Sequence, residues 1–419
     1  MAKAKHHELP DTQQTPLQLA VIQLTGIISL PVLASSVILR HLTNFTDALV
    51  TIIVANIVLW IIRYGILSMS YKGRKSALDI SKDYLGHGGG YFIGLLLLAS
   101  TLAWFVAETT LASNALTQLI PINTGEGVDR FIQTSVVLGI VSTLFCMEGI
   151  VVLRKLATYS FPLVMLAFIG ILLTTEHHPI EAHTPAITLI GLSLSLGSSL
   201  GITVDLPTFF RHSRSWRTSM HALTIIQLIS LGISIGGLFL EPALGPWLEA
   251  HDGVVYSSTG IMQKIFLVAL IFVSVICANV SNVYSSSVGW EIVAPVLAGR
   301  KEYLILGLGL TTVYITVANI FSFHSLLELT DNSLVNLCLV LVIAYVLHLL
   351  LRRPASHIEK IIYFFAWLIA TVINTLQFFH QFAPKFPPIF LGLATIAAVL
   401  LFGHLMLLFL KKQFHIFSH

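Results

Sequence analysis

The stretch YLILGLGLTTVYITVANI, residues 303–320, contains no charged side chain and no proline. A strand that crosses a membrane in a β-barrel is shorter, about ten residues, and alternates between apolar and polar side chains. The quoted stretch shows no such alternation, and it approaches the length of about 20 residues that a helix needs to cross a hydrocarbon core about 30 Å thick. It therefore predicts a membrane-spanning α-helix.

The chain offers twelve such stretches in succession, which predicts an all-α polytopic membrane protein with twelve transmembrane helices. The composition agrees, because 55% of the residues are hydrophobic and only 10% are charged, whereas soluble domains carry about 25% charged residues. Residues 1–15 are polar and the first apolar stretch has the full length of a span, so we expect no cleavable signal peptide. The predicted spans are 17–39, 46–69, 90–119, 131–147, 156–174, 187–209, 219–240, 262–290, 303–321, 325–350, 359–378 and 389–410.

The cysteines and histidines do not predict a metal centre. Cys146, Cys277 and Cys338 all fall inside predicted spans, at separations that fit neither a zinc motif nor a disulfide framework. The loosely spaced histidines at 177, 178 and 183 lie in a predicted loop. We interpret that loop as solvated, with metal binding by its histidines as the less favoured alternative.

Basic residues are distributed unequally between the two sets of predicted loops. With the N-terminus in the cytoplasm, eighteen lysines and arginines lie inside and three lie outside, a strong positive-inside bias. We therefore expect both termini in the cytoplasm and the protein in the inner membrane. The inside residues are Lys3, Lys5, Lys72, Arg74, Lys75, Lys82, Arg154, Lys155, Arg211, Arg214, Arg217, Arg300, Lys301, Arg352, Arg353, Lys360, Lys411 and Lys412, and the outside residues are Arg40, Arg130 and Lys385.

Glycines and a proline interrupt the first and the sixth predicted spans at corresponding places. The first contains GIISLP at residues 26–31, and the sixth contains GSSLG at 197–201, followed by Pro207. Non-helical backbone inside a membrane is tolerated only where it lines a cavity, so breaks at these places would mark a transport site. The alternative is that the small residues only allow close packing of helices.

The pattern of breaks fits two inverted repeats of five helices each. We expect a cytoplasmic tail at 1–15, a first repeat at 16–174, a second repeat at 187–350, two further helices at 358–411 and a cytoplasmic tail at 412–419. The identity between the halves is too low to show the repeat directly.

Polar residues in the third and eighth predicted spans are the first candidates for a binding site. Trp104 lies near the middle of the third span, and Glu108 follows one turn later on the same face. A carboxylate at this depth is costly unless it is paired or faces water, so Glu108 is a functional candidate. In the eighth span, Ser274, Ala278, Ser281 and Ser285 form one polar strip, and Asn279, Asn282 and Ser286 form a second beside it. Asn279 is closest to the middle of the span, although packing through interhelical hydrogen bonds explains the serines equally well.

Further charged residues lie within the predicted spans. Asp205 follows the glycine-rich stretch of the sixth span and precedes Pro207. It is a candidate proton carrier, or alternatively the N-cap of a helix that restarts after a break. Arg63 and Lys264 lie within a few turns of span ends, where we expect their long side chains to reach the interface, and no chemistry is assigned to them.

These residues resemble the nucleobase:cation symporter-1 family, which includes cytosine permeases and hydantoin, allantoin and purine transporters. The clearest stretch is DLPTFFRH at 205–212, which is similar to the family signature Asn-Ile-Pro-Asp-Phe-Thr-Arg-Phe at the inner end of the sixth helix. Shorter agreements follow in order along most of the chain, at residues 29–36 (SLPVLASS), 73–88, 104–105 (WF) and 278–280 (ANV).

The resemblance implies the five-plus-five inverted-repeat transporter fold with two additional C-terminal helices. It implies that substrate stacks on Trp104 and is hydrogen-bonded by residues at the positions of Glu108 and Asn279, with Ser29, Ser198 and Ser199 at the two helix breaks. Relatives carry an aromatic residue where Ser199 stands, so a sandwich between two rings is not expected here. The carboxylate of Glu108, which only accepts hydrogen bonds when ionised, favours a ligand with additional N–H donors or a positive charge.

The same resemblance implies a sodium site formed by carbonyls of the first helix and hydroxyls of the eighth, with Gly26 and Ser274 as the approximate matches. Val273 replaces a second hydroxyl there, which puts sodium coupling in doubt and leaves protonation of Glu108 or Asp205 as the other route. No further cofactor is expected.

We therefore expect a monomeric secondary transporter that imports a nucleobase or related nitrogen heterocycle with H⁺ or Na⁺. A vitamin precursor such as an aminopyrimidine or pyridine is the alternative substrate. An enzyme is disfavoured because the spans show no nucleophile–base pair and no metal-ligand set. A channel is disfavoured because no filter segment repeats. The expected partners are the heterocycle and the lipid bilayer, without nucleic acid.

Overall fold

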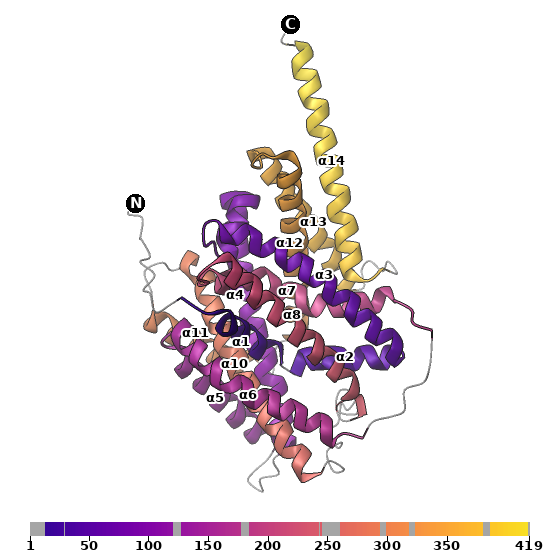
Figure 1. Ribbon diagram of the computed structural model, residues 1–419. Coiled ribbons are helices and arrows are strands. Elements are labelled where there is room, and N and C mark those ends of the chain that lie inside the picture. Colours follow the sequence, from indigo (N-terminus) through magenta and orange to yellow (C-terminus); the bar gives the residue numbers. More distant parts are fainter. Residues whose placement is uncertain are drawn as a thin grey trace.

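The computed structural model describes residues 13–28, 30–119, 127–176, 184–242, 244, 260–293, 299–317, 323–379 and 386–417. Helices account for almost all of these residues (Figure 1), together with one isolated bridge between Gln14 and Ser213. The helices are α1 (Pro16–Ile27), α2 (Leu30–Leu42), α3 (Phe45–Tyr71), α4 (Ala77–Leu119), α5 (Gly127–Cys146), α6 (Ile150–Thr174), α7 (Leu189–Phe210), α8 (Trp216–Phe239), α10 (Ile261–Val293), α11 (Arg300–Val317), α12 (Phe323–Leu351), α13 (His357–Phe378) and α14 (Pro388–Phe417).

The predicted all-α membrane class is confirmed, and a helix or helix pair occupies each of the twelve predicted positions. Within the described residues, nine helices are long and apolar enough to cross a bilayer, and the bent pair α1–α2 makes a tenth. The apolar part of α5, residues 131–146, is shorter than a span. The helix α11, which begins three residues before the stretch quoted first, is also outside this set.

The break in the first predicted span is confirmed. The axes of α1 and of residues 32–42 of α2 differ in direction by 56°. The start of α1 is fixed by a capping box, in which Thr15 and Gln18 exchange side-chain and backbone hydrogen bonds, and by Pro16 at its first position. Pro31 explains the other end, because proline cannot donate the backbone hydrogen bond that would continue a helix.

The predicted break in the sixth span is wrong, because α7 runs without interruption through 197–201. The small residues allow close packing instead. A methyl group added at Gly201 would collide with the carboxylate of Asp331 on α12, and one added at Gly197 would lie 3.6 Å from Ile389 of α14. Pro207 lies within the last turn of α7.

Two large hydrophobic clusters and a smaller one around Phe45 form the described interior. The first joins α1, α6, α8 and α10, and includes Phe105 of α4 and Phe209 of α7. The second joins α3, α12, α13 and α14, and includes Leu97 of α4 and Leu200 of α7. Because α4 and α7 belong to both clusters, the space between them is where the two parts of the molecule meet. The last helix, α14, extends away from the rest of the molecule along part of its length (Figure 1).

Candidate functional site

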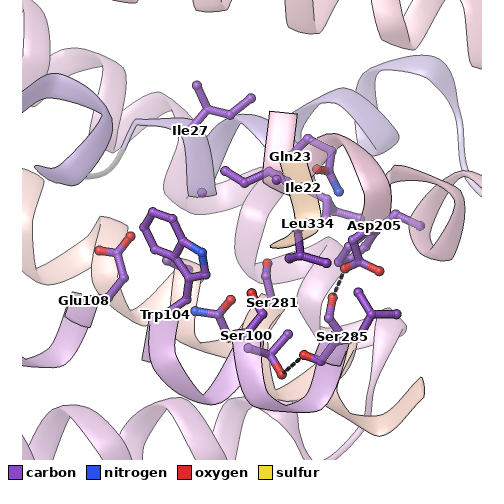
Figure 2. Close-up of a pocket in the computed structure, with 18 of the residues that line it drawn as sticks. Ile22, Gln23, Ile27, Ser100, Trp104, Glu108, Asp205, Ser281, Ser285 and Leu334 are labelled. Carbon is purple, nitrogen blue, oxygen red and sulfur yellow. Dashed lines mark hydrogen bonds between the residues drawn. The ribbon is translucent and has the colours of Figure 1, made fainter. Parts of the chain in front are cut away.

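The site is a cavity of about 100 Å³ enclosed by α1, α2, α4, α7, α10 and α12. It lies at the α1–α2 break, because Gly26 and Ile27 at the end of α1 and Val32 of α2 line it. The polar side chains on its wall come from α1, which contributes Gln23, and from α4, α7 and α10 (Figure 2). A concave, mainly apolar site with a few polar groups is the usual form of a small-molecule site.

One face of α4 supplies the two residues singled out first from the sequence. Leu97, Thr101, Trp104 and Glu108 recur at intervals of three or four residues and all line the cavity, as one helical face must. Glu108 is only 5% exposed. The predicted pairing of Trp104 with Glu108 on one face is therefore confirmed, and Figure 2 shows the indole and the carboxylate next to each other at one side of the cavity.

A second carboxylate, that of Asp205 on α7, lies across the cavity from Glu108 in Figure 2. It accepts a hydrogen bond from the hydroxyl of Ser285 on α10. The alternative interpretation, that Asp205 caps a helix restarting after a break, is wrong because α7 is continuous. Asp205 instead joins α7 to α10 on the wall of the cavity.

The face of α10 that lines the cavity carries Ala278, Ser281, Asn282 and Ser285. The predicted Asn279 is not among them. Its side chain is completely buried, and its amide Nδ2 donates to Thr109 Oγ1 of α4 over 2.9 Å. The two polar strips on this helix are recognisable from the sequence, but their spacing does not say which strip faces the cavity.

The other predicted site residues divide between several places. Gly26 lines the cavity, whereas Ser274 is 2% exposed and donates to the carbonyl of Ile271 on its own helix, 3.3 Å away. Ser199 lines a second, smaller cavity. Ser198 is helical, but its side chain is outside the described part of the structure. Ser29 also lies outside the described residues, as do the histidines at 177, 178 and 183.

Arg63 of α3 also differs from its prediction. It is 3% exposed and does not extend to an interface. Its Nε donates to Thr203 Oγ1 of α7 over 3.2 Å, and its Nη1 donates to Gln227 Oε1 of α8 over 2.9 Å. Gln227 donates in turn to the backbone and the side chain of Asn56. Asn56 lies two helical turns before Arg63 on the same face of α3, a spacing that indicates a shared polar face in the sequence.

A polar cluster lies just beyond the end of α7. Within the part of the sequence most similar to the family signature, His212 Nε2 is 2.9 Å from the hydroxyl of Tyr284 on α10. Burial lowers the pKa of His212 to about 3, with the charges of Arg211 and Arg74 acting in the same direction. His212 is therefore neutral at physiological pH. The backbone of the same loop also contacts the segment just before α1, because Gln14 N–H donates to the His212 carbonyl over 3.0 Å.

No protein-family model and no curated protein sequence matches the chain. Solved structures do. The structure of Mhp1, a nucleobase-cation-symport-1 family transporter in a closed conformation with bromovinylhydantoin bound, is similar with a TM-score of 0.69 at 15% identity, over 97% of this chain and 96% of that one. A Na⁺-coupled sialic acid symporter in a substrate-bound outward-open state is similar with a TM-score of 0.66 at 12% identity, over 94% and 89% of the two chains. The chain therefore has the fold of these two symporters along nearly its whole length.

Proposed function

We propose that the chain is a secondary active transporter that imports a nucleobase or a related nitrogen heterocycle together with H⁺ or Na⁺. The observation that carries this proposal is the indole of Trp104 beside the carboxylate of Glu108, both on the wall of a cavity at the α1–α2 break. Broken helices that meet a substrate site inside the membrane are a recurrent feature of secondary transporters. Mhp1, which shares this fold, binds a hydantoin.

Each element of the cavity supplies one part of substrate recognition. The indole of Trp104 offers a flat apolar surface on which a planar ring stacks. The carboxylate of Glu108 accepts hydrogen bonds from ring N–H groups. Asn282 has the role predicted for Asn279, that of hydrogen bonding to the substrate. Its side chain lines the cavity, and its amide can both donate and accept hydrogen bonds.

Coupling is assigned to the carboxylates in this proposal. Glu108 and Asp205 both line the cavity, so binding of substrate and binding of a proton can influence each other directly. A sodium site at Gly26 and Ser274 has less support, because the hydroxyl of Ser274 is turned toward the backbone of its own helix. The thermal-shift experiment is therefore made both with and without sodium.

One observation favours the second candidate, a vitamin precursor such as an aminopyrimidine or pyridine. Two carboxylates line a single cavity, and a protonated ring nitrogen or amino-substituted ring would offset the cost of their burial. Competition by a panel of nucleobases and aminopyrimidines against uptake of one radiolabelled substrate separates the two candidates.

The same proposal places the chain in the inner membrane as a monomer, with both termini in the cytoplasm. The cytoplasmic position of both termini is supported by the inequality of eighteen basic residues against three in the two sets of loops. A fluorescent protein that folds only in the cytoplasm, fused after residue 419, should be bright. A dark fusion with intact transport would overturn the orientation.

The function is tested first by thermal-shift screening of the purified full chain against nitrogen heterocycles, with and without sodium. We expect a saturable rise in melting temperature for one chemical class, because a ligand that binds only the folded state stabilises it. Uptake of the same compound should saturate and should show counterflow. Flux that rises linearly with concentration and lacks counterflow would indicate a channel and overturn the proposal.

A further inference from the structure

A second cavity, of about 30 Å³, lies beside the first and shares Ile27 and Val32 with it. Its wall is much more polar. Asn56 and Arg63 of α3, Ser195 and Ser199 of α7, and Ser230 and Ser234 of α8 line it. A cavity needs about 10–15 Å³ to hold one water molecule. The second cavity therefore has room for a small ion, and not for a heterocyclic ring.

Arg63 brings a full positive charge into this cavity, and among the described residues no carboxylate compensates it. Among the described residues its hydrogen-bond partners are Thr203 and Gln227, which are both neutral, and no acidic side chain lies within ion-pair distance of it. A charged side chain buried in a membrane protein is costly and is almost always paired or directed to water. Arg63 is 3% exposed. Its charge therefore has little contact with solvent and no acidic partner in the described part of the protein.

The cavity also holds hydrogen-bond donors that the protein leaves unused. A guanidinium has five N–H donors, and within the described residues Nη2 of Arg63 makes no hydrogen bond. The hydroxyl of Ser230 is buried and has no hydrogen-bond partner among the described residues. A buried hydroxyl without a partner is rare in folded proteins and calls for an unseen ligand, ion or water.

We propose that this cavity binds a small monovalent inorganic anion, chloride under cellular conditions, between Arg63 and the serine hydroxyls of α7 and α8. The anion neutralises the guanidinium and accepts hydrogen bonds from Nη2 and from Ser230. Because Ile27 and Val32 belong to both cavities, the anion also stabilises the geometry of the α1–α2 break. This inference concerns a site separate from the proposed substrate site, and it does not depend on the identity of the substrate.

The anion site is tested on the purified full chain by thermal unfolding at constant sodium and constant ionic strength, with gluconate replaced stepwise by chloride. We expect a melting temperature that rises by a few degrees and saturates with chloride, because the anion binds the folded state. Bromide should reproduce the rise. An identical melting temperature in gluconate and chloride would overturn the proposal, whatever the result of the heterocycle screen.

Two variants of Ser230 make the test independent of whether Arg63 can be replaced. Ser230→Asp puts a fixed carboxylate where the anion lies, so it should unfold at the higher temperature in gluconate and gain nothing from chloride. Ser230→Asn, which has the size of Asp but no charge, should not show the higher melting temperature of Ser230→Asp in gluconate. A full chloride response in Ser230→Asp would overturn the proposal.

Arg63→Gln removes the charge and should abolish the response to chloride. Its matched control is Arg300→Gln, because Arg300 lies at the surface, where it pairs with Glu148. The response of the control should equal that of the unaltered chain. A response lost equally in both variants would show that chloride acts at the surface and would also overturn the site.

Discussion

Trp104 is the residue on which we expect substrate affinity to depend most. Trp104→Ala removes the stacking surface, which is worth about 1–3 kcal/mol by analogy with base–aromatic stacking, and so should weaken binding about 5- to 150-fold. Trp104→Phe should retain most of the affinity. The measurement is the dissociation constant of the heterocycle that the thermal-shift screen identifies. Trp60→Ala is the control, because Trp60 is 39% exposed on α3, and equal affinity loss in both variants would remove Trp104 from the site.

Glu108 is the residue on which we expect coupling to depend. Glu108→Gln keeps a hydrogen-bonding group on the cavity wall but cannot take up a proton. The variant should therefore permit counterflow and lose accumulation driven by a pH gradient, and its affinity should no longer depend on pH. Asp205→Asn is the parallel variant for the second carboxylate. Accumulation that persists in Glu108→Gln and stops when sodium is withdrawn would favour a sodium site near Gly26.

At the scale of single residues, the sequence predicts which residues share a helical face better than it predicts what that face contacts. Trp104, Glu108 and Asp205 lie on the cavity wall as predicted, because depth and helical spacing can be read along one segment. Asn279 and Arg63 were misjudged for the same reason. Which side a residue faces depends on neighbouring helices, and those that contact Asn279 and Arg63 are far away in the sequence.

At the scale of helices, α7 lies so close to α12 that we expect it to tolerate no enlargement at Gly201. A Leu side chain there would occupy the cavity that Gly201 lines and would collide with Asp331. Overpacking of this kind typically costs about 1–3 kcal/mol, and binding should be lost as well. Heterocycle binding and melting temperature are measured together. Gly232→Leu on α8 is the control, because nothing lies within 4 Å of a methyl group added there.

The two predicted helix breaks had different outcomes for a physical reason. In the first span Pro31 removes a backbone donor and follows directly on the described break. In α7 the glycines and serines at 197–201 only lower helix stability slightly, and packing against α12 and α14 compensates. Both spans carry glycines followed by a proline, so the place of the proline decided the outcome: Pro31 lies at the break of the first span, whereas Pro207 lies within the last turn of α7.

At the scale of the whole molecule, the loop between α7 and α8 makes stability depend on pH. The pKa of His212 is lowered from 6.5 to about 3, so the unfolded chain takes up a proton at a higher pH than the folded one. The stabilising contribution of His212 is then fully present above about pH 6.5 and is lost progressively as the pH falls toward 3. His212→Gln should flatten the fall in melting temperature between about pH 7.5 and about pH 4.5. The exposed His221→Gln should leave the fall unchanged, and equal curves for all three chains would contradict the assignment.

The overall class of the molecule could be predicted because the length and apolarity of each segment are local properties. The arrangement of the helices could not, because lipid is as apolar as the helix faces themselves and hydrophobicity does not select their partners. The small cavity around Arg63 shows this. It needs α3, α7 and α8 to lie side by side, and no pattern within one of these segments indicates the other two.

The hydrogen bond between Gln14 and His212 gives the first helix two different ends. One end of α1 is held to the α7–α8 loop through this bond, and the other meets α2 at an angle of 56°. A helix held at one end and bent at the other can change direction only if this hydrogen bond breaks or the α7–α8 loop moves with it. A single backbone hydrogen bond contributes about 1 kcal/mol net to stability, so thermal motion can break this one. Faster amide hydrogen exchange at Gln14 when a heterocycle binds would then report the swing of α1 directly.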